Sequence, residues 1–371
     1  MRKVLFVSKP IVPPWHDGSK NLVRDIASHL ALAWPTVMTT ERATPSLGPR
    51  VTIDPVYREP GGFSPSLLAN ARVVRRLMSD RSHDVWHFVF APNIASSSVA
   101  RLAITARRAV GWNGRVVQTI ASAPKRFELA PSLLFGDVVV TLTEWTRARL
   151  LAQGVDGAKL RVIPPCSAPP RAVSPAECAK LREELSLGAG PIFVYPGDYE
   201  VSRGAETVAH AVSTIVRAVP EAHIVLACRP KTPRAAAARA NIERILTEER
   251  VIHRTRHVGQ MADIAPLVAS ATALLFPVDD LYGKVDLPLV LLEAMALGIP
   301  LVVARGGPLE ALSSADFVDP GDAPALARAA LKILRDGSPA RAERGRALYA
   351  ANFAPAVVAA RYDELYAQFS S

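Results

Sequence analysis

An acidic residue inside an apolar stretch is the first place where this sequence could do chemistry. Glu293 lies in LVLLEAMAL, and the residues around it from Leu289 to Met295 are all apolar. A helix here would carry the carboxylate into a core, where leaving it without a partner costs several kcal/mol. Two kinds of partner remain open: a backbone amide or arginine of the protein itself, or the hydroxyl groups of a bound sugar such as ribose.

The loop before this stretch has the residues that an anion needs. Gly283 permits close approach of the backbone, and Lys284 adds a cation. Free N–H groups at the start of the following helix would contribute the positive end of its dipole, and this combination suits a pyrophosphate. Asp286 is a typical N-cap and Gly298 a typical helix end, so we expect the helix between them.

A second loop with anion-binding character lies in PIFVYPGDYEVSRGAETVAHAV, where a strand leads through a loop into a helix. Arg203 immediately precedes this helix and Gly204 opens it. Such an arrangement would present a guanidinium and free amides to one phosphate group.

A third loop, KPIVPPWHDGSKN, follows a strand at 4–8 and enters a helix at 22–33. Gly18 permits close approach, Ser19 can cap the helix, and Lys20 is a cation beside free N–H groups. The loop therefore either binds an anion or only turns the chain.

The repeated order of strand, loop and helix predicts a doubly wound α/β protein, with ligands at the carboxyl ends of the strands. At 371 residues the chain is long enough for two domains. The proline-rich stretch APPRAVSP at 168–175 is the natural boundary between them. An amphipathic helix is expected at 355–369.

Three motifs resemble those of the family-4 retaining glycosyltransferases. They are LPLVLLEAMALGIPLVV at 287–303, GGPLE at 306–310, and the run from 136 to 165. The resemblance implies the GT-B fold, in which two Rossmann-like doubly wound domains face each other across a cleft. An acceptor-side domain would span residues 1–167 and a nucleotide-sugar-binding domain residues 176–354, with a helix at 355–371 crossing back to the first domain.

The resemblance also implies how the candidate residues act. The donor would be a nucleotide-diphosphate sugar, with Arg203 and Lys284 on the diphosphate and Glu293 on the ribose. No metal or other cofactor would be needed. The glycines that would allow close approach of the backbone are Gly18, Gly204 and Gly283.

On the other side of the cleft, the resemblance places His16 and Lys20 near the acceptor. His87, in the strand DVWHFVF, would be a catalytic residue near the reacting sugar. The family often has a second strand histidine, but Ala121 stands in its place here. His87 is thus either the remaining cleft histidine or a packed strand residue.

Two further departures concern the donor site. Asp198 stands where the family has a phosphate-binding arginine, and Val285 stands where it has the first of two glutamates. Either Asp286 has taken the place of that glutamate as a catalytic acid, or it only caps the helix and Lys284 is a new phosphate ligand. The second alternative is slightly favoured.

The basic charge of the chain is confined to its first half. Residues 1–165 hold 22 Lys and Arg against 11 Asp and Glu, whereas the remainder holds 22 against 23. There is no nucleic-acid recognition motif, so we expect an anionic or lipid-linked acceptor or an anionic membrane surface as partner, and no nucleic acid. The arginines of the helices predicted at 65–82 and 99–110 fit ordinary solvated faces.

No apolar run of transmembrane length and no leader segment is visible, and three scattered cysteines suggest neither disulfides nor zinc. We expect a cytoplasmic protein that can lie at the inner face of the membrane. The leading hypothesis is a retaining, metal-independent sugar transferase in which loop amides and cations stabilise the leaving diphosphate.

Two other functions remain open. A catalytically silent relative that binds a sugar nucleotide or a partner enzyme would explain the departures from the family motifs. A nucleotide-sugar epimerase of the same fold would need acid and base side chains, for which His16, Asp17 and His87 are candidates.

Overall fold

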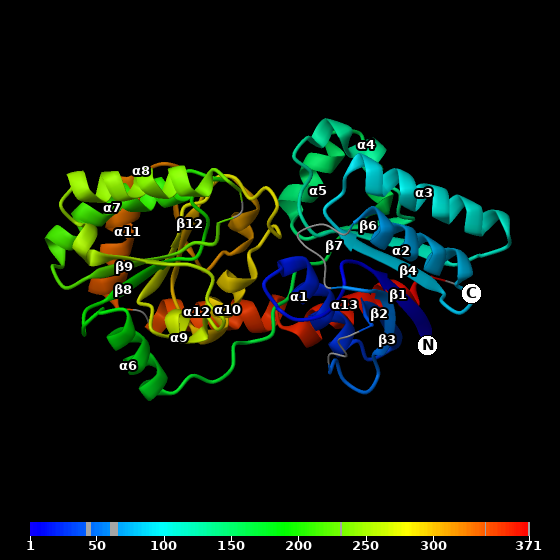
Figure 1. Ribbon diagram of the computed structural model, residues 1–371, viewed down its shortest axis with the longest axis horizontal. Helices are drawn as coiled ribbons and strands as arrows, with labels where there is room; N and C mark the ends of the chain where they lie inside the picture. The colour runs from blue at the N-terminus through cyan, green and yellow to red at the C-terminus, as the bar shows by residue number, and fades with distance from the viewer. Residues whose placement is uncertain (42–45, 60–65, 231, 338, 370–371) are drawn as a thin grey trace. The chain divides into compact units, whose positions relative to one another are not determined.

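The computed structural model describes residues 1–41, 46–59, 66–230, 232–337 and 339–369. The chain divides into two compact units (Figure 1). The first consists of Met1–Ala168, Tyr282–Leu289 and Asn352–Ser371, and the second of Pro169–Leu281 and Val290–Ala351. A short loop from the second half of the sequence, Tyr282–Leu289, is therefore part of the first unit. Within the described residues, no helix combines the length and the apolar character needed to cross a membrane.

The first unit is built on a parallel sheet with the strand order β3-β2-β1-β4-β5-β6-β7. The order reverses between β1 and β4, as in a doubly wound domain. The strands are β1 (Arg2–Val7), β2 (Ala33–Thr40), β3 (Thr52–Tyr57), β4 (Val85–Phe90), β5 (Arg115–Ile120), β6 (Val138–Thr141) and β7 (Leu160–Val162).

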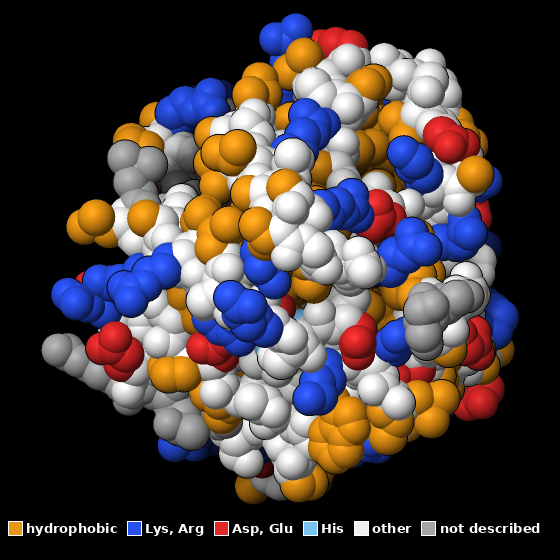
Figure 2. Space-filling model, turned by 90° about the vertical axis from the view of Figure 1, so that its right-hand side faces the viewer, with side chains coloured by type: hydrophobic (Ala, Val, Ile, Leu, Met, Phe, Trp, Pro, Cys, Tyr) orange, Lys and Arg blue, Asp and Glu red, His pale blue; other side chains and the backbone are white. Residues whose placement is uncertain are grey.

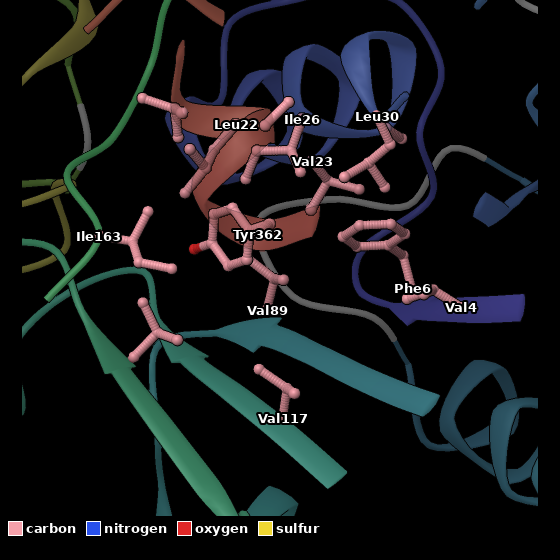
Figure 3. Close-up of a cluster of buried hydrophobic side chains, with 14 of the residues drawn as sticks. Val4, Phe6, Leu22, Val23, Ile26, Leu30, Val89, Val117, Ile163 and Tyr362 are labelled. Carbon is pink, nitrogen blue, oxygen red and sulfur yellow. The ribbon is translucent and has the colours of Figure 1, made fainter. Parts of the chain in front are cut away.

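Helices cover both faces of this sheet. Alternate residues of β1 belong to different buried clusters, because successive side chains of a strand point to opposite faces. One cluster includes α1 (Gly18–His29) and α13 (Pro355–Ala367), and Figure 3 shows the ring of Tyr362 from α13 beside Leu22, Val23 and Ile26 of α1. The other includes α2 (Leu67–Ser79) and α3 (Ile94–Ala109). The short helices are α4 (Ala130–Leu133) and α5 (Glu144–Leu151).

The second unit repeats this plan with a parallel sheet of order β10-β9-β8-β11-β12-β13. Its strands are β8 (Ile192–Tyr195), β9 (His223–Ala227), β10 (Thr255–Val258), β11 (Ala273–Phe276), β12 (Leu301–Ala304) and β13 (Asp316–Val318). Its helices are α6 (Pro175–Glu184), α7 (Gly204–Ala218), α8 (Ala235–Glu248), α9 (Ala265–Ala269), α10 (Leu289–Leu297), α11 (Ala323–Asp336) and α12 (Pro339–Asn352). Two parallel sheets with interleaved helices confirm the predicted doubly wound α/β class.

Two predicted helix caps are wrong. The helix that carries Glu293 begins at Leu289, three residues after Asp286, so Asp286 is not its N-cap. The cap of α1 is Asp17 rather than Ser19, because the Asp17 carboxylate accepts the N–H groups of Ser19 and Lys20. The end of α10 is as predicted, since Gly298 follows its last residue with a φ of +76°, a conformation that favours glycine.

Candidate functional site

The strand order of the second sheet reverses between β8 and β11, and ligands of doubly wound sheets bind beyond the carboxyl ends of strands at such a point. An ion pair joins the two loops there. Arg203 Nε lies 2.8 Å from Asp279 Oδ2, and the backbone N–H of Arg203 donates to Asp279 Oδ1 at 3.1 Å. The Arg203 side chain is 65% exposed, so the guanidinium is held at one end and still accessible to a ligand.

The N-terminus of α7 lies directly behind this ion pair. Arg203 is the N-cap residue, and its side chain makes no capping hydrogen bond. Gly204 opens the helix in tight packing, because a Cβ there would lie 2.7 Å from Tyr195 Oη and 2.9 Å from Val278 Cγ2. We expected Gly204 to let a ligand approach the backbone closely. In the structure, the side chains of Tyr195 and Val278 make this close approach instead. The N-terminus of α7 and the Arg203 guanidinium thus lie together at the carboxyl edge of the sheet, with the Asp279 carboxylate beside them.

Asp198 lies in the loop after β8, at the position where the resemblance implies a phosphate-binding arginine. Its side chain is fully buried, and Oδ1 accepts the backbone N–H of Val201 at 3.0 Å. Its carbonyl oxygen accepts the hydroxyl of Tyr195 at 3.0 Å. Asp198 therefore shapes the loop from inside, and its carboxylate does not face a ligand at the surface.

Two other loops complete this edge. After β13, the backbone of Gly321 lies beside the guanidinium, where a Cβ would stand 3.5 Å from Arg203 Nη1. After β12, Gly306 has a φ of +86°, and its N–H donates to Glu310 Oε1 at 2.9 Å. Glu310 of the GGPLE motif therefore stabilises the loop after β12, in which it lies itself.

Glu293 lies in the middle of α10 and is half-buried. The residues on either side of it, Leu292 and Ala294, are fully buried. The apolar helix expected around the carboxylate is therefore present, although the carboxylate is not carried as deep as the sequence suggested.

The loop Tyr282–Leu289 is anchored in the first unit by Asp286. This residue is 1% exposed, and its Oδ2 accepts the hydroxyls of Thr146 at 2.5 Å and Thr143 at 3.0 Å. Burial raises the pKa of the carboxyl, although the two hydroxyls and the N–H of Ala123 oppose that shift. Thr143 is the N-cap of α5, so Asp286 serves the start of α5 instead of capping α10.

The same loop packs against the start of α1. Val285 belongs to the buried cluster of the first unit, and a Cβ on Gly18 would lie 2.8 Å from Val285 Cγ2. Gly18 therefore admits Val285, where we expected it to admit a ligand. Lys284 is half-buried, and burial lowers its pKa to about 8, while Gly283 is exposed with a φ of +72°.

The structure does not support the catalytic role predicted for His87. The side chain is 0% exposed inside the first sheet. Its Nδ1 lies 2.7 Å from Tyr366 Oη, and its Nε2 lies 2.7 Å from Thr119 Oγ1. Burial lowers the pKa of His87 to about 3, so the ring stays neutral at physiological pH. It is a packed strand histidine with both nitrogens engaged.

The loop after β1 holds the residues predicted for the acceptor side. Lys20 is 8% exposed and its Nζ lies 3.4 Å from the carbonyl oxygen of Pro14, so here it braces the loop and does not present a cation to solvent. Burial lowers its pKa. Asp17 pairs with Lys9 at 2.6 Å; burial raises the pKa of Asp17, but Lys9 together with the hydrogen bonds from Ser19 and Lys20 lowers it overall. His16 is half-buried in the same loop.

The candidate residues thus fall into two groups, each within one unit. Arg203, Gly204 and Glu293 lie in the second unit, and the others, Gly18, His16, Lys20, His87, Gly283, Lys284 and Asp286, lie in the first. Sequence reasoning missed Asp279, although an acid just after a buried strand was a usable signal. It also missed a contact between the loop after β8 and strand β10, where Tyr199 Oη lies 2.9 Å from His257 Nδ1.

The three cysteines are all free. Across the described ranges, no three His, Cys, Asp or Glu side chains are grouped as ligands of one metal ion would be.

Comparison with known proteins identifies the fold. Residues 190–336 match the sequence model of the family described as Glycosyl transferases group 1. A search of curated proteins finds no significant match.

Solved structures match the chain over nearly its whole length. Anabaena HepE in complex with UDP and glucose is 16% identical, with a TM-score of 0.77 and 100% of both chains covered. Sucrose-phosphate synthase of Thermosynechococcus elongatus is 21% identical, with a TM-score of 0.75 and 99% of both chains covered. A glycosyltransferase of Rickettsia africae is 16% identical, with a TM-score of 0.72 and coverage of 98% and 97%. The chain therefore has the GT-B fold, and its second half matches glycosyl transferases group 1.

Proposed function

We propose that the protein is a cytoplasmic, retaining glycosyltransferase that moves a sugar from a nucleotide-diphosphate sugar to an anionic or lipid-linked acceptor. The observation that carries this proposal is the Arg203–Asp279 pair in front of the α7 N-terminus, inside the segment that matches the family. A guanidinium and a helix N-terminus together bind phosphate groups and stabilise the charge that develops on a leaving diphosphate. The reaction would need no metal ion.

The nucleoside would extend from this diphosphate along the second unit. A half-buried carboxylate such as Glu293 can accept hydrogen bonds from the two hydroxyls of a ribose. The structure of HepE, a protein of the same fold, contains UDP and glucose, and this supports a nucleotide sugar as the donor class.

Lys284 would add a second cation during turnover. Of the two charged residues in its loop, Asp286 is committed to the hydroxyls of Thr143 and Thr146. This commitment argues against Asp286 as a displaced catalytic acid and favours the alternative in which Lys284 acts on the diphosphate. With a pKa of about 8, Lys284 carries a charge at neutral pH.

Incubation with nucleotide sugars, with and without acceptor extracts, tests the proposal. We expect release of nucleoside diphosphate, and transfer of the sugar with an unchanged anomeric configuration. An isomerised sugar nucleotide would instead identify an epimerase. Donor binding without any turnover would support a catalytically silent protein, an alternative favoured by Val285, whose packing in the first core leaves no carboxylate at that position.

A further inference from the structure

Helices α2 and α3 have an unusual charge composition. They lie side by side on one face of the first sheet, with Val73, Leu77 and Ile104 turned into the buried cluster. Together they carry six arginines and no aspartate or glutamate. A solvated helix face normally mixes both signs of charge, so the partners of these arginines have to be found one by one.

The outer side of α3 carries several large apolar side chains. Ile94 is 60% exposed, Val99 45% and Leu102 72%, and Val110, directly after the helix, is 67% exposed. The spacing of these positions places them on the solvent side of the helix, and no charged residue lies among the exposed positions from Ile94 to Leu102. On α2, Leu68 is 75% exposed and Met78 39%. Apolar side chains gathered in this way mark an interaction surface.

Most of the arginines are engaged inside the first unit. Arg76 pairs with Asp54 and Asp80, and Arg108 with Asp137. The arginines that bond backbone carbonyl oxygens are Arg101, with those of Pro131 and Leu134, and Arg107, with that of Asp80.

Arg72 and Arg75 differ from these four. They have no hydrogen bond or ion pair to any part of the chain that the structure describes, and Arg75 is exposed. Arg75 therefore presents its charge to solvent, and the half-buried Arg72 lies one helical turn from the exposed Leu68. Figure 2, seen from the right-hand side of Figure 1, shows hydrophobic and basic side chains next to one another on the first unit.

We propose that the outer faces of α2 and α3, which we call the α2/α3 surface, dock on an anionic lipid bilayer. Exposed leucine, isoleucine and valine side chains would enter the acyl boundary, while Arg72 and Arg75 would meet the lipid phosphates. A second copy of the chain does not fit, because two such surfaces would bring arginines against arginines. Nucleic acid does not fit either, since its phosphates would leave the leucines unmatched. This inference goes beyond the proposed transfer reaction and does not depend on it.

Vesicle sedimentation without nucleotide tests the charge requirement. The full-length protein should bind vesicles of 70% phosphatidylcholine and 30% phosphatidylglycerol in low salt, and at least tenfold less in 0.5 M salt or on pure phosphatidylcholine. Arg72→Glu with Arg75→Glu should weaken binding by at least ~25-fold, since each cation near the surface contributes roughly fivefold. The control, Arg328→Glu with Lys332→Glu, makes the same charge change at exposed positions of α11 and should bind normally.

The apolar requirement is tested separately. Leu68→Ser and Leu102→Ser should each weaken binding by about tenfold, whereas Ile252→Ser, at an exposed position of the second unit, should not. A fluorophore on Leu102→Cys, in a Cys178→Ser background, should shift to the blue on anionic vesicles, and the same label on Ile252→Cys should not. The blue shift shows whether the labelled position enters the bilayer, so this test does not depend on a variant that loses binding.

The expected pattern is binding that needs anionic lipid, both arginines and both leucines. The proposal is overturned if the wild-type protein ignores anionic vesicles in low salt. It is also overturned if the α11 control loses binding as strongly as the α2 variant, because net charge alone would then explain the effect. A label at position 102 that stays unchanged on bound vesicles would mean that another surface docks.

Discussion

Replacing Arg203 by alanine separates ligand binding from stability. The Arg203 side chain is 65% exposed, and exposed ion pairs contribute only about 0–1 kcal/mol to folding, so the free energy of unfolding should hardly change. A hydrogen bond to a charged group contributes about 1.5–3 kcal/mol, and each 1.4 kcal/mol is about tenfold in affinity. Nucleoside diphosphate binding should therefore weaken roughly 10- to 150-fold. The carboxylate of Asp279 would be left beside the anion, which moves the expected loss toward the upper end.

Calorimetric titration of UDP, GDP, ADP and dTDP would first identify the base, and the selected diphosphate would then be compared with its nucleoside. The loss in Arg203→Ala should appear with the diphosphate and not with the nucleoside. Arg203→Lys should recover only part of it, because lysine keeps the charge but not the guanidinium fork. Arg244→Ala, which removes a similarly exposed partner of Glu248 on α8, is the matched control. Equal affinity of Arg203→Ala and wild type for the diphosphate would refute the assignment.

Three further outcomes are expected. Glu293→Ala should weaken diphosphate binding by about 1.5–3 kcal/mol, and an unchanged calorimetric affinity would remove the ribose assignment. Because the pKa of Lys284 is lowered to about 8, its charge is lost as the pH rises through 8, so turnover should fall above that pH. A pH–rate profile of Lys284→Arg should extend to higher pH, and a profile identical to wild type would exclude the residue. Asp286→Ala should lower the free energy of unfolding in urea by about 1–3 kcal/mol, because buried hydroxyls lose their acceptor, and an undiminished value would show that the anchor is dispensable.

Local signals predicted the elements well because each depends on residues close in sequence. The apolar runs form the parallel strands. The end of α10 at Gly298 was predicted correctly because it depends only on the backbone conformation of that glycine. The helices expected at 65–82 and 99–110 are present as α2 and α3, and the doubly wound class followed from the order of these elements.

Side-chain partners could not be predicted, because they come from distant parts of the chain. Asp286 meets Thr146 across 140 residues, so the nearer alternative, a cap on the following helix, looked sufficient. His87 meets Tyr366 across 279 residues, and only the packing of α13 on the first sheet shows that the ring is enclosed. The glycines illustrate the same limit: Gly18 and Gly204 do allow close approach, but of Val285, Tyr195 and Val278.

The loop Tyr282–Leu289 explains why the family motif is altered. Val285, in the place of the expected glutamate, packs against Gly18 in the first core, where a carboxylate would be buried without a partner. Asp286, one residue later, is held by two threonine hydroxyls. Both residues therefore serve the attachment of the loop to the first unit. Lys284 is the other charged residue of the loop, and its pKa, lowered by burial to about 8, keeps it cationic at neutral pH while making any contribution to turnover sensitive to mild alkali.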